Sequence, residues 1–234
     1  MKLVSYLQKN TKLSRRGITK LIDEGVIFLN KNIVESYAQK VEVGDTITVE
    51  GKNYSIVQKD LQDNDSTHAK MLLFHKPLGY VVSKNDPHNR TIYEILPKKY
   101  HNWRYIGRLD KNSSGLLLLT DDSSLVHKYE HPKFNLQKEY LVQLDHQLSS
   151  ADIDQILKGV YEGGDVLETV DIQKVGGQTK STRYRIVLNQ GKKRHIRRIF
   201  KALDNKVLTL QRVREGKFVL GNLDIGAWRE VAVK

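Results

Sequence analysis

The stretch Gly107-Arg108-Leu109-Asp110-Lys111-Asn112-Ser113-Ser114-Gly115 runs directly into the apolar residues Leu116-Leu117-Leu118-Leu119-Thr120. Two glycines bracket a polar loop, and the apolar run that follows is typical of a buried strand. Folded proteins often place reactive side chains on loops that a buried strand holds in position. Asp110 is therefore a candidate functional carboxylate. An aspartate in a loop more commonly caps a turn, so the pattern alone leaves both roles open.

The composition excludes several classes of site. The 234 residues contain no cysteine, which excludes disulfides, thiolate nucleophiles and cysteine zinc sites. The absence of cysteine also fits a reducing, cytoplasmic compartment. No apolar run reaches the ~18 residues of a membrane span, and the N-terminus is too polar for a signal peptide. The histidines lack the spacing of metal ligands, so we expect no metal site.

The charge of the chain is positive and unevenly distributed. The net charge is +12, and the segment from Lys192 to Arg214 contains nine basic residues against one acidic residue, Asp204. A polyanion attracts such a protein through the release of counterions. General solubility would also explain a positive charge, but its concentration in one segment favours a nucleic-acid-binding face.

The residues after Gly191 predict an amphipathic helix. Apolar and basic residues both recur at i, i+3, i+4 and i+7, and the two sets are displaced by two positions, so they face opposite ways. One face would pack, and the other would present cations to something negative, although a solvated basic face has the same pattern. The apolar set is Ile196, Ile199, Phe200 and Leu203, and the basic set is Arg194, Arg197, Arg198 and Lys201.

The pattern along the chain predicts an α+β protein with two parts. Residues 1–52 are expected to form a small αα-β module, in which Ser14 caps a helix, Gly25 ends it, and a hairpin turns at residues 30–32. The polar residues 53–68 are expected to be a linker. Residues 69–234 are expected to form a larger domain with a mixed, mostly antiparallel sheet flanked by helices. Its clearest strands are expected at 71–74, 116–119, 140–144 and 184–188, and its helices at 153–157 and 196–203.

Several blocks together resemble the catalytic domain of the bacterial rRNA pseudouridine synthases, of the types called A (small subunit) and B, E and F (large subunit). The resemblance covers nearly all of residues 70–231. The blocks are Gly107 to Asp110 with Ser114 to Thr120, Lys76-Pro77-Leu78-Gly79-Tyr80, Lys138-Glu139-Tyr140, Gly191 to Phe200, and Leu223 to Glu230.

The N-terminal residues resemble the alpha-L RNA-binding module that a small-subunit ribosomal protein shares with tyrosyl-tRNA synthetase. The matching stretches are Leu13-Ser14-Arg15-Arg16, Gly25 to Asn30, and Val43-Gly44-Asp45-Thr46-Ile47.

The resemblance implies a role for individual residues. Asp110 would be the catalytic carboxylate, Arg197 its basic partner, and Tyr140 the ring that stacks on the base. The base pocket would also contain Ile196, Arg108 and Leu109. The residues expected to contact RNA are Ser14, Arg15, Arg16, Lys20, Asn30, Lys31, Lys76, Lys192, Lys193, Arg194, Arg198 and Lys201.

The same resemblance implies a cytoplasmic, monomeric isomerase that acts on ribosomal RNA, free or in an assembling ribosome, without a membrane, a metal or a cofactor. The sequence departs from the family at His195, where a glutamine or related polar residue is common, and at Lys192, where arginine is common. Residues 76–87 lean toward the small-subunit enzymes, and the Arg194 and Arg197-Arg198 pattern is closer to the large-subunit ones. The target uridine therefore stays open.

Two other functions also fit parts of the sequence. A non-catalytic RNA-binding factor in ribosome assembly would use the N-terminal module and the basic segment equally well. It would not explain why Asp110, Tyr140 and Arg197 occur in motif order. A metal-dependent nuclease would use Asp110 with Asp121 or Asp122.

Overall fold

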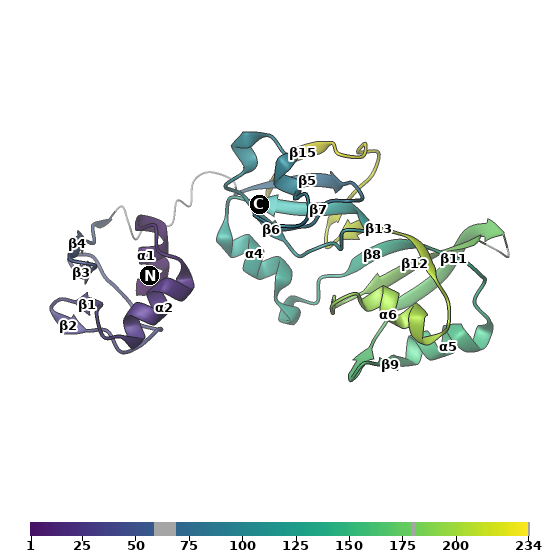
Figure 1. The fold of residues 1–234 in the computed structure, drawn as a ribbon, viewed down its shortest axis with the longest axis horizontal. Coiled ribbons are helices and arrows are strands. Elements are labelled where there is room, and N and C mark those ends of the chain that lie inside the picture. The colour runs from purple at the N-terminus through teal and green to yellow at the C-terminus, as the bar shows by residue number, and fades with distance from the viewer. Residues whose placement is uncertain (59–68, 179–180, 234) are drawn as a thin grey trace. The chain divides into compact units, whose positions relative to one another are not determined.

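The computed structural model describes residues 1–58, 69–178 and 181–233. The chain divides into two compact units, Met1–Thr67 and His68–Lys234, each of which has its own core (Figure 1). Of the predicted linker, residues 59–68 lie outside the described residues. Within the described ranges, no helix is both long enough and apolar enough to cross a membrane.

The N-terminal unit begins with two helices, α1 (Leu3–Asn10) and α2 (Arg15–Asp23). The Ser14 hydroxyl caps α2 by accepting a hydrogen bond from the Gly17 amide at 3.1 Å, as predicted. Gly25 follows the helix end with a φ of +67°, a conformation in which glycine is favoured. The buried faces of both helices pack into the apolar core of this unit.

A four-stranded sheet in the order β2-β1-β3-β4 completes the N-terminal unit. Strands β1 (Phe28–Leu29) and β2 (Asn32–Ile33) form the predicted hairpin. Strand β3 (Thr46–Val49) pairs with β4 (Lys52–Ser55), and Ile56 is buried. The N-terminal unit therefore extends beyond residue 52, because β4 completes the sheet with residues that the sequence prediction assigned to the linker.

The second unit is built on one large sheet, for which the described residues give nine strands. The sheet is mostly antiparallel, as predicted, and its central path runs β11-β12-β8-β13-β7-β5-β15. These strands are β5 (Ala69–Lys76), β7 (Ser114–Thr120), β8 (Lys138–Leu144), β11 (Asp171–Gln178), β12 (Ser181–Leu188), β13 (Val207–Glu215) and β15 (Trp228–Val233).

The parallel pair β7–β13 joins the two halves of this sheet, and it depends on Gly115. Gly115 lies opposite Arg212 in the register of the two strands. Its φ is +110°, and a Cβ at this position would lie 2.2 Å from the Arg212 carbonyl oxygen. Only glycine fits this close approach of two backbones. The loop that precedes β7, with Asp110, is therefore held at the junction of the two half-sheets.

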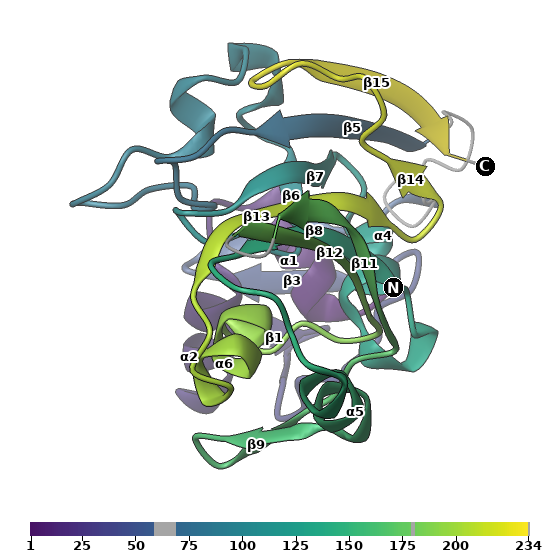
Figure 2. The same cartoon turned by 90° about the vertical axis from the view of Figure 1, so that its right-hand side faces the viewer.

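Helices cover the sheet on both sides. Figure 2 shows α5 (Ser150–Lys158) and α6 (His195–Ala202) on the same side of β8, β11 and β12, where their apolar residues join the main core. Helix α4 (Ser123–Glu130) packs on the other half, in a separate cluster with leucines of β5 and β7. The remaining helices are short 3₁₀ helices: η1 (Ile92–Glu94), η2 (Lys98–Tyr100) and η3 (Pro132–Phe134). The remaining strands are β6 (Arg104–Ile106), β9 (Val160–Glu162), β10 (Asp165–Leu167) and β14 (Phe218–Val219).

Candidate active site

A pocket of about 830 Å³ opens above the junction of the two half-sheets. The loop between β6 and β7, which contains Asp110, forms one wall, and the start of α6 forms another. All three predicted catalytic residues, Asp110, Tyr140 and Arg197, line this pocket, together with Ile196 and Leu109. Arg108 also lines it and is exposed. The structure therefore brings together residues that the sequence separates by almost ninety positions.

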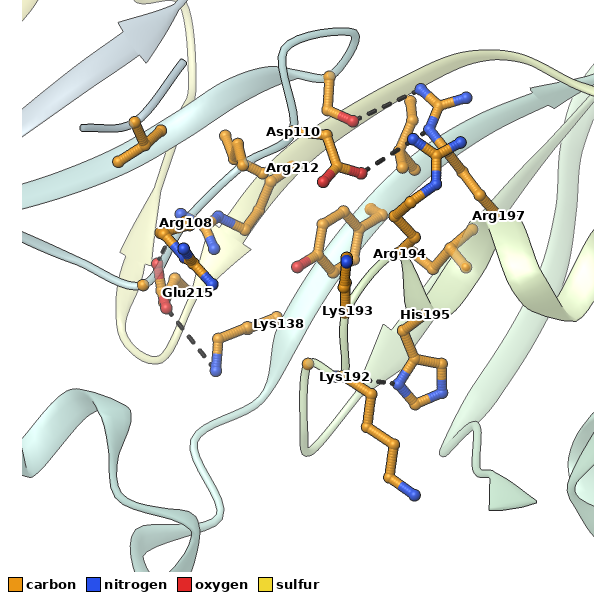
Figure 3. A pocket seen from close by; sticks show the side chains of 18 of the residues that line it. Arg108, Asp110, Lys138, Lys192, Lys193, Arg194, His195, Arg197, Arg212 and Glu215 are labelled. Carbon is orange, nitrogen blue, oxygen red and sulfur yellow. Dashed lines mark hydrogen bonds and ion pairs between the residues drawn. The ribbon is translucent and has the colours of Figure 1, made fainter. Parts of the chain in front are cut away.

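Asp110 and Arg197 form an ion pair at the pocket wall (Figure 3). Nε of Arg197 lies 3.9 Å from Oδ2 of Asp110. Nη2 of Arg197 donates to the Asn112 carbonyl oxygen at 2.5 Å and to Oγ of Ser113 at 3.5 Å. The guanidinium thus holds the loop of Asp110 as well as its carboxylate. Nε itself is buried without a hydrogen-bond partner among the described residues, so its proton faces Asp110 without competition.

The Asp110 side chain is 36% exposed, whereas that of Arg197 is 15% exposed. Burial lowers the pKa of Arg197, repulsion from Arg194 lowers it further, and the charge of Asp110 raises it. Arginine nevertheless stays protonated at physiological pH. Asp110 is therefore a carboxylate that solvent or a ligand can reach, and it is fixed in position by a nearly buried cation.

Lys76 supports the same loop from below. Its side chain is fully buried, and Nζ donates to the Ser113 carbonyl oxygen at 2.8 Å and to that of Pro77 at 2.9 Å. The prediction that Lys76 contacts RNA is wrong for this structure, because the ammonium group does not reach the surface. Burial lowers the pKa of Lys76 to about 8, against the opposing effect of Asp110.

This buried ammonium predicts a pH dependence of stability. Below pH 8 the lysine is charged in both the folded and the unfolded state, so the folded state bears the full cost of burying the charge. As the pH rises from about 8 toward the unfolded pKa of about 10.4, Lys76 loses its proton in the folded state while it stays charged in the unfolded state. The cost of burying the charge then disappears, so the free energy of unfolding rises. We expect Lys76→Met to lack this rise.

The measurement is urea unfolding of both proteins at pH 7 and pH 9.5, followed by tryptophan fluorescence. The only two tryptophans, Trp103 and Trp228, belong to the second unit, so the signal reports the unit that contains Lys76. Parallel changes in stability for the two proteins would show that Lys76 titrates as an exposed lysine does.

Tyr140 lies on the floor of the pocket, on strand β8. It is 7% exposed and pairs in register with Arg212 of the neighbouring strand β13. Burial raises the pKa of its hydroxyl, Arg212 lowers it in part, and the charges of Glu215 and Asp110 raise it further. Tyr140 is therefore a neutral phenol close to both Asp110 and the Arg212–Glu215 pair.

The sequence prediction missed three charged residues of the pocket, Lys138, Arg212 and Glu215. Arg212 is 1% and Glu215 0% exposed, and Nη2 of Arg212 lies 3.1 Å from Oε2 of Glu215. Nζ of Lys138 lies 3.7 Å from Oε1 of the same carboxylate. One signal was present in the sequence: Arg212 shares a strand face with the buried Leu210, a position where an apolar residue is expected.

His195 is a neutral residue of the pocket wall. It is 4% exposed, and burial lowers its pKa to about 4, with a further decrease from Lys192. Its Nδ1 lies 3.4 Å from the Lys192 amide nitrogen, which donates to it. At neutral pH His195 therefore orders the turn that leads into α6 and holds no charge. Neither its sequence context nor its position in the structure indicates a catalytic role.

Part of the predicted basic face is neutralised within the protein. Nε of Arg198 lies 2.6 Å from Glu162, and Nη1 lies 2.8 Å from Asp165. Nζ of Lys192 is 3.1 Å from Asp165, and Lys201 is 3.8 Å from Glu162. The hairpin β9–β10 thus supplies the acids that compensate the stripe of cations. Arg198, whose side chain is 19% exposed, is a poor candidate for contact with RNA.

Some of the other side chains that are predicted to contact RNA are held in hydrogen bonds within the protein, whereas others are exposed cations. Ser14 caps α2, and Asn30 pairs with Asp45 at 2.7 Å and accepts from the Thr46 amide at 2.9 Å, so both have local structural roles. Arg194 lines the pocket and begins α6 with a φ of +54°, which is unusual for a residue other than glycine. The exposed cations of the predicted set are Arg15, Arg16, Lys20, Lys31, Lys193, Arg194 and Lys201.

The geometry is unfavourable for the nuclease alternative. Asp110 precedes β7, whereas Asp121 and Asp122 follow it, and Asp122 caps α4 by accepting from the Ser124 amide at 2.7 Å. A strand of this length separates its ends by roughly 20 Å, too far for carboxylates that share a metal. In the described parts of the chain, no group of three or more histidine, aspartate or glutamate residues is arranged to hold a metal ion.

Comparisons with known proteins agree with this geometry. Residues 70–202 match the model of a family described as RNA pseudouridylate synthase. An uncharacterized RNA pseudouridine synthase of Aquifex aeolicus is 30% identical, in an alignment that covers 99% of this chain and 92% of the relative. A ribosomal large subunit pseudouridine synthase B of Yersinia pestis is 32% identical, over 100% of this chain and 73% of the relative. The crystal structure of a pseudouridylate synthase superposes with a TM-score of 0.68 at 25% identity, covering 99% of this chain and 96% of that one. With the matching motifs gathered around one pocket, the chain belongs to the RNA pseudouridine synthase family.

Proposed function

We propose that this enzyme isomerises a specific uridine of ribosomal RNA to pseudouridine, with Asp110 as its single catalytic carboxylate and with no cofactor. The observation that carries the proposal is the pair of Asp110 and Arg197, 3.9 Å apart, in a pocket that also contains Tyr140 and Ile196. Relatives named ribosomal large subunit pseudouridine synthase B support ribosomal RNA as the substrate.

The reaction must break the bond between N1 of uracil and C1′ of ribose and form a bond between C5 and C1′. N1 gains a proton, and C5 loses one. Asp110 acts near C1′, either as a nucleophile that forms a covalent intermediate or as a base that removes the C2′ proton. Glycoside hydrolysis usually needs two carboxylates and a water. A base that never leaves the pocket needs no activated water, so one carboxylate suffices.

The remaining residues of the pocket bind and orient the base. A uridine within folded RNA must first leave its stack, at a cost of a few kcal/mol. The Tyr140 ring and the buried Ile196 provide apolar contact for the extruded uracil. Phosphate contacts from exposed cations, such as Lys193 and Arg194 at the pocket, offset the cost of extrusion.

Tritium release tests the proposed reaction. RNA transcribed with uridine labelled at C5 should lose tritium to water in the presence of the enzyme, because C5 loses its hydrogen when it joins C1′. We expect release from transcribed large- or small-subunit rRNA, with EDTA present throughout. RNA binding without release would instead identify the non-catalytic assembly factor, and release that requires divalent ions would indicate metal chemistry.

We further propose that the N-terminal unit binds RNA, as its resemblance to the alpha-L module implies. Three exposed cations, Arg15, Arg16 and Lys20, lie in the N-terminal two turns of α2. Replacing all three by glutamine is expected to weaken rRNA binding. A plot of the logarithm of affinity against the logarithm of salt concentration has a negative slope. The magnitude of this slope should fall by about one for each phosphate that the variant no longer binds.

The control for this triple variant removes three exposed lysines of the same unit, Lys9, Lys40 and Lys52. It causes the same loss of net charge without changing α2. Filter binding at several salt concentrations measures both slopes. Equal effects of the two variants would show that net charge alone, and no specific surface of the module, attracts the RNA.

A further inference from the structure

The carboxylate of Glu215 lies between two cations in the wall of the active-site pocket. It is fully buried, with Arg212 on one side at 3.1 Å and Lys138 on the other at 3.7 Å. Figure 3 shows Glu215 and Lys138 on one side of the view and Arg197 on the other, with Arg212 and Asp110 between them. Gly107, the first glycine of the loop that contains Asp110, lies directly beside it: a Cβ there would be 3.6 Å from Glu215 and 3.7 Å from Arg212.

An irregularity in the sheet creates the triad. Residues three apart on a regular strand face opposite sides. The register of β13 shifts between Arg212 and Arg214, so Arg212 pairs with Tyr140 and Glu215 pairs with Lys138. Tyr140 and Lys138 are two residues apart on β8 and share a face. The bulge therefore places Glu215 on the same face as Arg212, toward the pocket.

Among the residues that the structure covers, three polar atoms of the triad have no hydrogen bond beyond the ion pairs just described, whereas Nε of Arg212 donates to the Leu116 carbonyl oxygen at 2.7 Å. Both oxygens of Glu215 and Nη2 of Arg212 are buried and have no hydrogen-bond partner among the described residues. A buried charged group in this state is costly, and native proteins usually satisfy such groups with a protein, water or ligand partner. Because these atoms belong to pocket-lining residues, a polar group bound in the pocket is the natural partner.

The order of the groups is complementary to one nucleobase. Lys138 and Arg212 are donors only, and an ionised Glu215 is an acceptor only, so the triad presents donor, acceptor and donor. The Watson–Crick edge of uracil presents O2 as an acceptor, N3–H as a donor and O4 as an acceptor. Cytosine presents an acceptor at N3 and a donor at N4, so its N3 lone pair would face the carboxylate of Glu215.

We infer that Lys138, Glu215 and Arg212 read the Watson–Crick edge of the target base and select uracil over cytosine. This inference rests on the proposed function. Tyr140 lines the same pocket as Asp110 and pairs in register with Arg212 of the triad. A base stacked on its ring with C1′ at Asp110 turns the opposite edge toward the triad. Glu215 accepts the N3 proton, and the two cations donate to O2 and O4.

The test measures discrimination between bases. The probe is a short RNA that spans the mapped target site and carries either uridine or cytidine at the target position. We expect wild-type enzyme to bind the uridine form about 10- to 100-fold more tightly. In Glu215→Gln the amide can present either its donor or its acceptor, so the preference for uridine should fall to about threefold or less.

The matched control is Glu139→Gln. Glu139 lies on the same strand as Lys138, but its carboxylate pairs with Arg185 and Arg214 outside the pocket.

The inference is overturned if wild-type enzyme binds the two RNAs equally, or if Glu215→Gln retains the wild-type preference. A structural role alone would lower the stability or the affinity for both RNAs and leave their ratio unchanged. If Glu215→Gln does not fold, wild-type enzyme is tested with 3-methyluridine at the target, which lacks the N3 proton. Isomerisation of that RNA at the normal rate contradicts the inference, and at least a tenfold loss of binding supports it. Wild-type conversion of the uridine form is checked first, so failure of the proposed function is distinguished from failure of the edge readout.

Discussion

Asp110→Asn is expected to abolish pseudouridine formation and to leave RNA binding nearly intact. Asparagine keeps the size and shape of the side chain but cannot act as a nucleophile at C1′ or as a base toward the C2′ proton. We expect the turnover rate to fall on the order of 10⁴-fold or more, as when a residue that performs the chemistry is removed. Single-turnover tritium release measures the rate, and filter binding measures the affinity for the same RNA.

The matched control for this substitution is Asp121→Asn, at the opposite end of β7. Asp121 is exposed and does not line the pocket. We expect it to keep the wild-type rate. Residual activity of Asp110→Asn close to that of the control would remove Asp110 from the chemistry and favour the turn-capping role that its loop position alone suggests.

Arg197→Ala is expected to cause the second largest loss, about 10²- to 10³-fold in turnover, with a smaller effect on affinity. The guanidinium fixes Asp110 through Nε at 3.9 Å, and the loop of Asp110 through the Asn112 carbonyl oxygen at 2.5 Å. Alanine removes both interactions. Lysine retains a charge but has a single donor group, so Arg197→Lys should recover only part of the rate.

Lys201→Ala controls for charge on the same helix. Lys201 lies four residues after Arg197 on α6, and its side chain is 79% exposed. Its loss should weaken RNA binding modestly, in a salt-dependent way, and should leave single-turnover chemistry unchanged at saturating enzyme. If Arg197→Ala had the same profile as Lys201→Ala, Arg197 would be a phosphate contact and not the partner of Asp110.

The local elements of both units could be predicted from the sequence, because their signals are local. The Ser14 cap, the hairpin at residues 30–32 and the buried strand after Gly115 each depend on residues within a few positions of one another. The resemblance also placed Asp110, Tyr140 and Arg197 in one pocket, and the structure brings them there. Their roles in the reaction remain predictions that the variants above test.

The partners of the buried charges could not be predicted, because they depend on long-range geometry. Arg198 lies on the basic stripe of α6, but Glu162 and Asp165 reach it from a hairpin more than thirty residues earlier. The resemblance implied that Lys76 contacts RNA, whereas strand β5 buries it beneath the loop of Asp110.

The edge-reading triad was missed for a related reason. Arg212 and Glu215 meet on one face of β13 only because the register shifts between them, and no regular strand pattern predicts that shift. The triad assigns selection of the base to the wall of the pocket. Selection among the uridines of the RNA must then come from the exposed cations outside the pocket.

Comparison of pseudouridine maps from rRNA of cells that have or lack this gene tests the central claim most directly. We predict that a specific pseudouridine disappears when the gene is removed, returns with the wild-type gene, and does not return with Asp110→Asn expressed at the same level. Identical maps in all four strains would contradict the claim that this enzyme modifies ribosomal RNA. Restoration of the site by Asp110→Asn would contradict the role of Asp110.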